Sequence, residues 1–176
     1  MFRVRFLKKE DFSSIIPLLI EGHEIHKENR EDVFSDLNLD FINKQLNQAF
    51  KDDDSHIFVV EDIEKKKIVG FALSKIHVTF NIPLLKSSSY LFIDNFIINK
   101  EYRNKGVGKI LFASIKNFCL LKKLDNIQLN VWNFNEGAIK FYKVLGFSTS
   151  KKRLELKLDI NDLNLIDDNF IESLQA

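Results

Sequence analysis

The residues best suited to chemistry lie in the stretch Tyr102–Lys109, YRNKGVGK, which follows an apolar run from Tyr90 to Ile98. Gly106 and Gly108 have no Cβ, so the backbone at these positions can come close to a ligand. We expect a helix to begin here, and the amide hydrogens of its first turn would point outward at a positive dipole end. The stretch therefore predicts a pyrophosphate-binding site, with added positive charge from Arg103, Lys105 and Lys109.

The spacing of this stretch excludes two common nucleotide-binding loops. A P-loop has Ser or Thr after Gly-Lys and a glycine five residues before that Gly, but here Ile110 follows Lys109 and Arg103 stands where the first glycine would be. The dinucleotide fingerprint requires a third glycine at the position of Leu111. A small GTPase-like phosphate binder is disfavoured for the same reason as the P-loop. The remaining pattern is Arg-x-x-Gly-x-Gly.

A second block, NIQLNVWNFNEGAIKFYKVLGF, extends from Asn126 to Phe147. Together, the two blocks resemble the cofactor motifs of the GNAT superfamily of N-acetyltransferases in order and separation. The resemblance covers residues 2–158, and the first half matches by pattern rather than by motif. The matching positions of the second block are Val131, Asn135, Ala138, Phe141, Tyr142, Gly146 and Phe147.

The resemblance implies that acetyl-CoA is the co-substrate. In the family, main-chain groups of the central strand pair with the pantetheine arm, which here means Phe96, Ile97 and Ile98. Asn135 matches an asparagine that contacts the cofactor, although capping the helix that starts near Glu136 is an alternative role and both are compatible. The pyrophosphate would be held by the glycine loop, through Arg103, Asn104, Lys105, Gly106, Val107, Gly108 and Lys109.

Two residues are candidates for catalysis. Tyr142 matches the family tyrosine that acts as general acid, and a phenol titrating near ~10 stays protonated at neutral pH. The alternative is a core tyrosine whose hydroxyl is bonded to a carbonyl. Asp94 lies on an apolar strand, where polyamine-type members carry an acidic base that acts through water. Its alternative role is a carboxylate satisfied by nearby amides or a lysine.

The resemblance implies an acetyltransferase in which a primary amine attacks acetyl-CoA directly in a ternary complex, so Cys119 need not be a nucleophile. The acceptor is a small-molecule amine or a peptide amine, and the Asp94 neighbourhood favours a small polyamine or similar amine. An acidic rim from Glu24, Glu28 and Asp32 would suit a cation, but a solvated helix face is the alternative. Two other functions stay open: a non-catalytic acyl-CoA-binding regulatory module, and a protein N-terminal or lysine acetyltransferase.

Composition narrows the class of protein further. The net charge of +1 over 176 residues gives no reason to expect nucleic acid or a membrane surface as partner. The single cysteine, Cys119, excludes an intramolecular disulfide, and it is expected to be buried and inert. No metal-ligand spacing is present, and no signal peptide or membrane span is recognised, so the chain is predicted to be cytoplasmic.

The pattern along the chain predicts an α+β fold with a mixed central sheet of about six to seven strands and about four helices, in agreement with the GNAT fold. We expect one domain over 1–158, closed by a strand from Arg153 to Leu158, and an acidic extension over 159–176. The extension is predicted either as a short docking helix or as a partly ordered tail. Because many relatives pair through their C-terminal strands, the resemblance also allows a homodimer. Other expected strands are Phe2–Phe6, His56–Val60, Ile68–Phe80, Tyr90–Ile98 and Ile127–Trp132, and the expected helices begin near Asp11, Leu39, Val107 and Glu136.

Overall fold

The computed structural model describes residues 1–80, 82–84 and 86–159, in which five strands form one sheet in the order β1-β2-β3-β4-β5. The first four strands pair antiparallel, and β5 pairs parallel with β4. The sheet is therefore mixed, as expected, but the described residues contain five strands rather than six or seven. The strands are β1 (Phe2–Phe6), β2 (Ser55–Asp62), β3 (Lys67–Thr79), β4 (Ser88–Ile98) and β5 (Asn126–Leu129).

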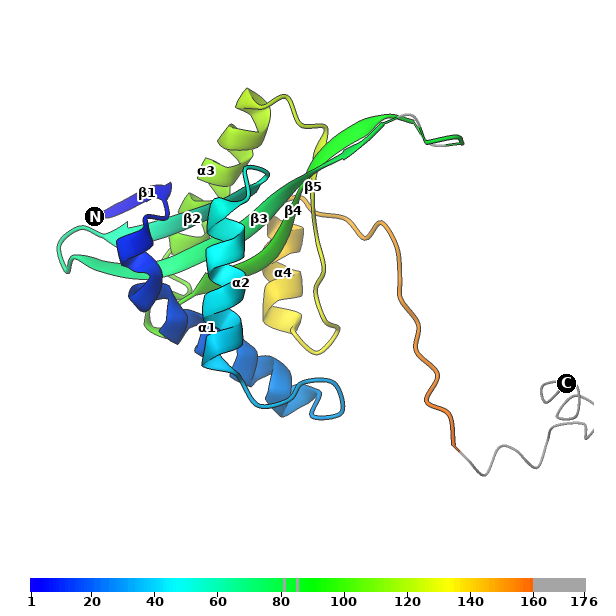
Figure 1. Cartoon of the computed structure of the whole chain (residues 1–176), viewed down its shortest axis with the longest axis horizontal. Helices are drawn as coiled ribbons and strands as arrows, with labels where there is room; N and C mark the ends of the chain where they lie inside the picture. The colour runs from blue at the N-terminus through cyan, green and yellow to red at the C-terminus, as the bar shows by residue number, and fades with distance from the viewer. Residues whose placement is uncertain (81, 85, 160–176) are drawn as a thin grey trace, which may run out of the picture. The chain divides into compact units, whose positions relative to one another are not determined.

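Helices cover both faces of the sheet (Figure 1). α1 (Phe12–Asn29) and α2 (Leu39–Lys51) pack on one face, and α3 (Val107–Leu121) packs on the other. α4 (Glu136–Val144) follows β5, and Phe141 near its end lies 5.7 Å, ring to ring, from Phe96 of β4. The expected number of four helices is confirmed for the described residues.

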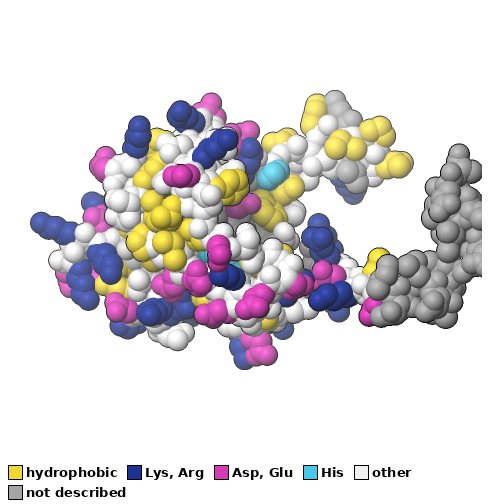
Figure 2. Space-filling model, turned by 60° about the horizontal axis from the view of Figure 1, so that its bottom comes forward, with side chains coloured by type: hydrophobic (Ala, Val, Ile, Leu, Met, Phe, Trp, Pro, Cys, Tyr) yellow, Lys and Arg dark blue, Asp and Glu magenta, His cyan; other side chains and the backbone are white. Residues whose placement is uncertain are grey.

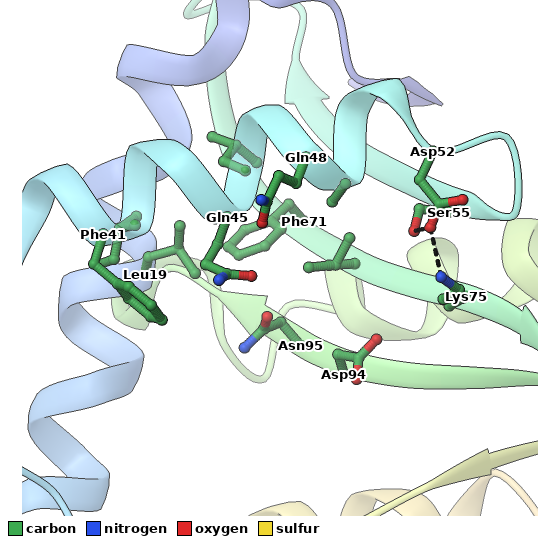
Figure 3. Close-up of a pocket in the computed structure, with 14 residues that line it drawn as sticks. Leu19, Phe41, Gln45, Gln48, Asp52, Ser55, Phe71, Lys75, Asp94 and Asn95 are labelled. Carbon is green, nitrogen blue, oxygen red and sulfur yellow. Dashed lines mark hydrogen bonds and ion pairs between the residues drawn. The ribbon is translucent and has the colours of Figure 1, made fainter.

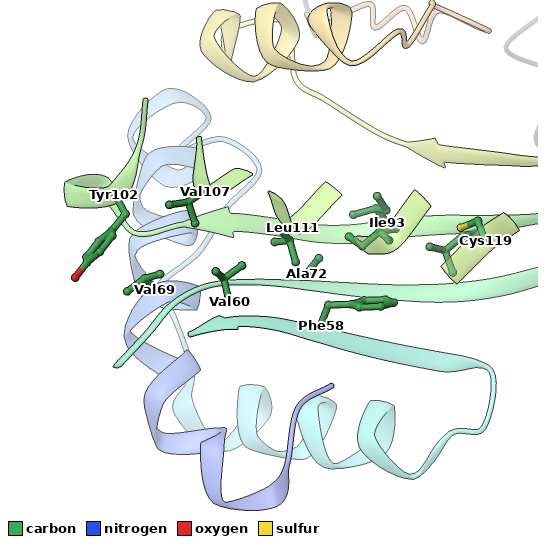
Figure 4. Close-up of a cluster of buried hydrophobic side chains, with 11 residues drawn as sticks. Phe58, Val60, Val69, Ala72, Ile93, Tyr102, Val107, Leu111 and Cys119 are labelled. Carbon is green, nitrogen blue, oxygen red and sulfur yellow. The ribbon is translucent and has the colours of Figure 1, made fainter. Parts of the chain in front are cut away.

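Strand alternation divides the core into two layers. On β2, Phe58 and Val60 point toward α3, whereas Ile57 and Val59 point toward α1 and α2. This alternation is the period of two that a strand imposes on its side chains. α3 packs an apolar stripe against the sheet (Figure 4), in which Val107, Leu111 and Ile115 are fully buried.

The start of α1 explains the role of Asp11. Its carboxylate does not cap α1 but accepts the Lys8 amide at 2.7 Å and pairs with both terminal nitrogens of Arg5. A 3₁₀ turn, Lys9–Asp11, precedes the helix, and Pro17 lies inside the helix. The helix therefore begins after a 3₁₀ turn rather than with a side-chain cap.

The β3–β4 hairpin projects beyond the neighbouring strands and carries exposed apolar side chains near its end (Figure 2). Lys75 and His77 lie between this end and the centre of the sheet on β3. The exposed apolar residues are Val78, Phe80, Ile82 and Leu84.

Two predicted strands differ from the structure. β5 ends at Leu129, because Trp132 packs against Phe34 and stacks on Phe134 instead of continuing along β4. The expected closing strand from Arg153 to Leu158 is wrong, since its residues are exposed and pair with no described strand. Its alternating pattern is that of a strand, but a strand also needs a partner for its amide and carbonyl groups.

The chain falls into two units, Met1–Phe141 and Tyr142–Ala176. The second unit is described as far as Asp159 and contains the end of α4 followed by irregular chain. The predicted docking helix of the C-terminal extension lies outside the described residues. Among the described helices, none is both long and apolar enough to cross a membrane.

Candidate active site

The glycine loop ends in the N-terminus of α3, as the sequence predicts. Gly106 is the N-cap residue and has a φ of 81°, in the left-handed region that favours glycine. No side chain caps the helix, and no acceptor among the described residues meets the amides of Val107, Gly108 and Lys109. These amides lie at the positive end of the helix dipole, so an anionic group is the partner that they lack.

The two glycines have different functions. No atom lies within 4 Å of the position where a Cβ on Gly106 would stand, so this side of the loop is open. A Cβ on Gly108 would instead lie 3.0 Å from Phe141 Cζ. Gly106 is therefore required by its backbone conformation, and Gly108 is required by the close packing of α4 on the first turn of α3.

Arg103 is held by protein groups rather than directed into the loop. Its Nε donates to the carbonyl of Ile98 at 2.9 Å, and its terminal nitrogen pairs with the carboxylate of Glu21 on α1. The side chain thus ties α1 to the end of β4, while its main chain still belongs to the loop. Lys105 lies over the ring of Tyr102 at 5.7 Å, and Lys109 is exposed.

Beyond Ile93, one edge of β4 has no partner strand among the described residues, because β5 pairs only with Tyr90–Ile93. The other edge pairs with β3, where Ile97 lies opposite Phe71 and the Asn99 amide donates to the Val69 carbonyl. In an antiparallel ladder the hydrogen-bonded pairs alternate. The main-chain groups of Ile97 therefore point toward β3, and those of Phe96 and Ile98 point toward the open edge.

A β-bulge places Asp94 in the site. Leu73 of β3 lies opposite Asn95, and the next residue, Ser74, lies opposite Ile93, so Asp94 is the extra residue of β4. A bulge shifts the alternation of the strand by one residue. Leu91 and Ile93 before it, and Phe96 after it, all contribute to the α3 side of the core. The side chains of Asp94 and Asn95 can therefore both lie on the opposite face of the sheet, which α2 covers.

Both residues line a cavity of about 590 Å³ between α2 and the sheet (Figure 3). The other charged residues of its lining are Asp52 and Lys75, whose ion pair measures 2.7 Å. The remaining lining is apolar or uncharged, and consists of Leu19, Phe41, Ile42, Gln45, Leu46, Gln48, Ala49, Ser55, Phe71 and Leu73. The cavity thus combines a carboxylate, a salt bridge, side-chain amides and an apolar wall.

The environment of Asp94 makes its carboxyl a stronger base than usual. Surrounding protein atoms raise its pKa, and the nearby charges of His77 and Lys75 partly offset this effect. The side chain still has solvent access. A carboxylate with a raised pKa, at the wall of a cavity, is suited to accept a proton from a bound group.

Tyr142 and Asn135 lie on and before α4. Burial raises the pKa of the Tyr142 hydroxyl to about 12, so the phenol is protonated at neutral pH. Its ring lies 5.5 Å from that of Phe147 in the same unit. The Oδ1 atom of Asn135 accepts the Ala138 amide at 3.1 Å, so the alternative capping role is confirmed. Its contact with a cofactor remains a prediction.

Among the residues that line the cavity, the sequence predicted only Asp94 as a site residue. The polar lining residues that were not predicted are Gln45, Gln48, Asp52, Ser55, Lys75 and Asn95. Asn95 follows Asp94, and regular alternation would have placed the two side chains on opposite faces. The predicted acidic rim is not part of this cavity: Asp32 pairs with Arg30, and Glu24 and Glu28 are exposed. The region around residues 22–37 instead forms an aromatic cluster, in which Phe34 contacts His23, His26 and Trp132.

A family model described as the acetyltransferase (GNAT) family matches residues 19–147, which include the glycine loop, Asp94 and Tyr142. The chain belongs to this family. A solved structure of similar fold, a tetramutant of the BH1408 protein of Bacillus halodurans, has a TM-score of 0.83 at 26% identity, and the match covers 89% of this chain and 99% of that chain. The GNAT fold expected from the motifs is thereby confirmed.

Curated relatives share about half of their length with this chain. A probable spermine N(1)-acetyltransferase of Bacillus subtilis subsp. natto is 32% identical over 81 residues, which are 46% of this chain and 52% of the relative. The L-ornithine N5-acetyltransferase NATA1 of Arabidopsis thaliana is 24% identical over 123 residues, which are 70% of this chain and 52% of the relative. Both relatives are named as acetyltransferases of amines, which agrees with the family assignment.

Proposed function

We propose that the chain is an N-acetyltransferase that transfers the acetyl group of acetyl-CoA to a primary amine by direct attack in a ternary complex. The observation that carries this proposal is the organisation of β4. Within five residues the strand has a carboxylate in a cavity, at Asp94, and main-chain groups that face an edge with no partner strand among the described residues, at Phe96 and Ile98. At this edge the Ile98 carbonyl accepts Arg103 Nε. The chain then enters the uncapped N-terminus of α3.

The described residues fit acetyl-CoA as co-substrate. The amides of Val107, Gly108 and Lys109 lack acceptors and suit a pyrophosphate, and the space beside Gly106 admits it. The open edge of β4 suits an amide-containing arm that adds to the sheet as a strand would. Acetyl-CoA, when bound, supplies an activated acyl group as a thioester. Among the three strand residues predicted from the sequence, the ladder favours Phe96 and Ile98 over Ile97.

The chain's own residues would then move the protons. A primary ammonium titrates near ~10, so the acceptor must lose a proton before it can attack. We assign this role to Asp94, which acts directly or through a water molecule. Tyr142 is assigned the opposite role of general acid, because its hydroxyl keeps its proton at neutral pH and can donate it to a departing thiolate.

Thermal unfolding with ligands in excess tests the donor site. Acetyl-CoA and free CoA at ~100 times their dissociation constants should stabilise the protein by about 2.7 kcal/mol, whereas ATP and GTP should have no effect. Stabilisation by ATP or GTP alone would overturn the proposal. Thiol release from acetyl-CoA with a panel of amines then tests turnover, and stabilisation without thiol release would favour the regulatory acyl-CoA-binding alternative.

A further inference from the structure

The cavity beside α2 has an uneven charge. Its charged lining residues are Asp52, Lys75 and Asp94, two carboxylates and one ammonium. Figure 3 shows Asp52 and Lys75 at one end of the cavity and Phe41 and Leu19 at the other, with Asp94 and Asn95 below them on β4. How these three charges are paired determines which acceptor the cavity can stabilise.

Asp52 accepts hydrogen bonds from three protein donors. Its Oδ2 atom accepts Lys75 Nζ at 2.7 Å and the Ser55 hydroxyl at 2.8 Å, and its Oδ1 atom accepts the Asp54 amide at 3.2 Å. The hydrogen bond from Lys75 is the largest of several effects that lower the pKa of Asp52 to about 2, so the carboxylate stays ionised and paired. The pair adds no net charge to the cavity.

Asp94 is in a different state. No described residue forms a hydrogen bond or ion pair with its carboxylate, although the charges of Lys75 and His77 act on it from β3. The cavity therefore presents one carboxylate that a ligand can pair with. The rest of the lining offers apolar side chains and the amides of Gln45, Gln48 and Asn95, none of which compensates a second positive charge.

We propose that the acceptor of this site is a primary amine with a single positive charge on a largely apolar body, and that Lys75 sets this preference by neutralising Asp52. The inference rests on the proposed function and specifies its acceptor. The acceptor's ammonium pairs with Asp94, and its hydrocarbon chain lies along Leu19, Phe41 and Ile42. A second ammonium group would find no unpaired carboxylate, because Lys75 already pairs with Asp52, and it would lie against apolar side chains.

The lining of this cavity is poorly suited to a polycation. A polyamine brings several ammonium groups, and each one needs a carboxylate or solvent. The cavity provides one carboxylate, and its second is held by three protein donors. Removing the charge of Lys75 would release Asp52 and give the cavity two available carboxylates, so the preference should move toward diamines.

Hexylamine and 1,6-diaminohexane are a matched pair of probes, because they have the same chain length and differ by one amino group. With acetyl-CoA saturating, we expect kcat/KM to be about tenfold higher for hexylamine, since the interaction of two charges about 10 Å apart near a protein surface is of this order and the second ammonium lacks a partner for it. Spermine should be a poorer acceptor than the diamine. A wild-type preference for 1,6-diaminohexane or spermine would overturn the inference while leaving the proposed function intact.

Variants test whether charge is the cause. Lys75→Met should move the ratio of the two kcat/KM values toward the diamine by about tenfold. The double variant Asp52→Asn/Lys75→Met returns the cavity to one carboxylate and should restore the wild-type ratio. Lys44→Met removes an exposed lysine of α2 that lies outside the cavity lining, and it should leave the ratio unchanged. Lys75→Arg keeps the charge and should also leave it unchanged.

Failure of the role given to Lys75 and failure of the proposed acetyl transfer give different experimental results. If the double variant keeps the ratio of Lys75→Met, shape rather than charge sets the preference and the role given to Lys75 is wrong. If no single variant changes the ratio, Lys75 is likewise excluded. If no amine in the panel releases thiol from acetyl-CoA, the proposed function fails, and the acceptor inference fails with it. Circular dichroism of each variant verifies the fold before its ratio is interpreted.

Discussion

Gly106 provides the most direct test of how the glycine loop is built. Its φ is 81°, and a Cβ added there would have no atom within 4 Å. Replacement by alanine therefore introduces no clash, and the whole cost comes from forcing an L-residue into the left-handed region. This cost is about 1–2 kcal/mol. Because 1 kcal/mol shifts the midpoint of a domain of this size by about 2–4 °C, Gly106→Ala should lower it by roughly 2–8 °C.

The measurement is thermal unfolding followed by circular dichroism, with Gly137→Ala as the matched control. A Cβ on Gly137 would also have no atom within 4 Å, but its φ lies outside the left-handed region, and it stands in the first turn of α4. Alanine favours a helix over glycine by up to about 1 kcal/mol, so the midpoint of Gly137→Ala should stay the same or rise. Gly106→Asn should lose less than Gly106→Ala, since asparagine tolerates positive φ, as Asn104 already does in this turn.

The comparison of the two unfolding midpoints, for Gly106→Ala and Gly137→Ala, tests whether the positive φ of Gly106 causes the loss of stability. If Gly106→Ala is as stable as the wild type, then the left-handed N-cap is not a feature of the folded protein. If both alanine variants lose stability equally, then a cost common to any added methyl group, rather than φ, is responsible. Each variant is measured first without and then with acetyl-CoA, so a loss of intrinsic stability is distinguished from a loss of stabilisation by the ligand.

Three further predictions follow from the charged and buried groups. Because burial raises the pKa of Asp94, its base form is lost at a higher pH than that of an ordinary aspartate. The value of kcat/KM should rise with pH as this carboxyl ionises, and Asp94→Asn should lack that limb of the profile. Arg5 holds the pKa of Asp11 below its usual value, so the pair stabilises the fold above the unfolded pKa of about 3.9 and this contribution is lost as pH falls through the folded pKa. Asp11→Asn should accordingly lower the free energy of unfolding by about 2 kcal/mol at pH 7, measured with urea, and the deficit should shrink in acid; an equal deficit at all pH values would contradict the assignment. Burial raises the pKa of the Cys119 thiol to about 11, so a thiol reagent should modify it only on unfolding, and rapid labelling of the native protein would show that the core around α3 is open.

The sequence predicted the parts of the fold that depend on short-range patterns. The stripe of α3 and the buried strands β2 and β3 have the spacing that a helix or strand requires, so their positions could be read directly. The closing strand from Arg153 to Leu158 failed for the opposite reason. Its alternation is clear, but Leu154, Leu156 and Leu158 are more than 80% exposed, and pattern alone cannot provide a pairing partner.

The glycine loop was predictable from its residues, but the different structural roles of its residues were not. Gly106 and Gly108 look equivalent in the sequence, and both were expected to let a ligand approach the backbone. The structure distinguishes them, since Gly106 has a positive φ and Phe141, which is distant in sequence, closes the space beside Gly108. The charge of Arg103 also looked available for phosphate, whereas Glu21 and the Ile98 carbonyl hold its side chain.

The candidate acceptor site depends on a single residue that breaks a pattern. In a regular strand, Asp94 and Asn95 would face opposite sides, and Asn95 would point with Leu91 and Ile93 into the apolar layer under α3. The bulge at Asp94 prevents this burial of an amide, and it brings Phe96 back to the α3 layer, where its ring meets Phe141. The same shift directs the main chain of Phe96 and Ile98 to the open edge. One inserted residue thus sets the position of the carboxylate, the lining of the cavity and the direction of the main-chain groups at the edge of β4. Its removal should change all three.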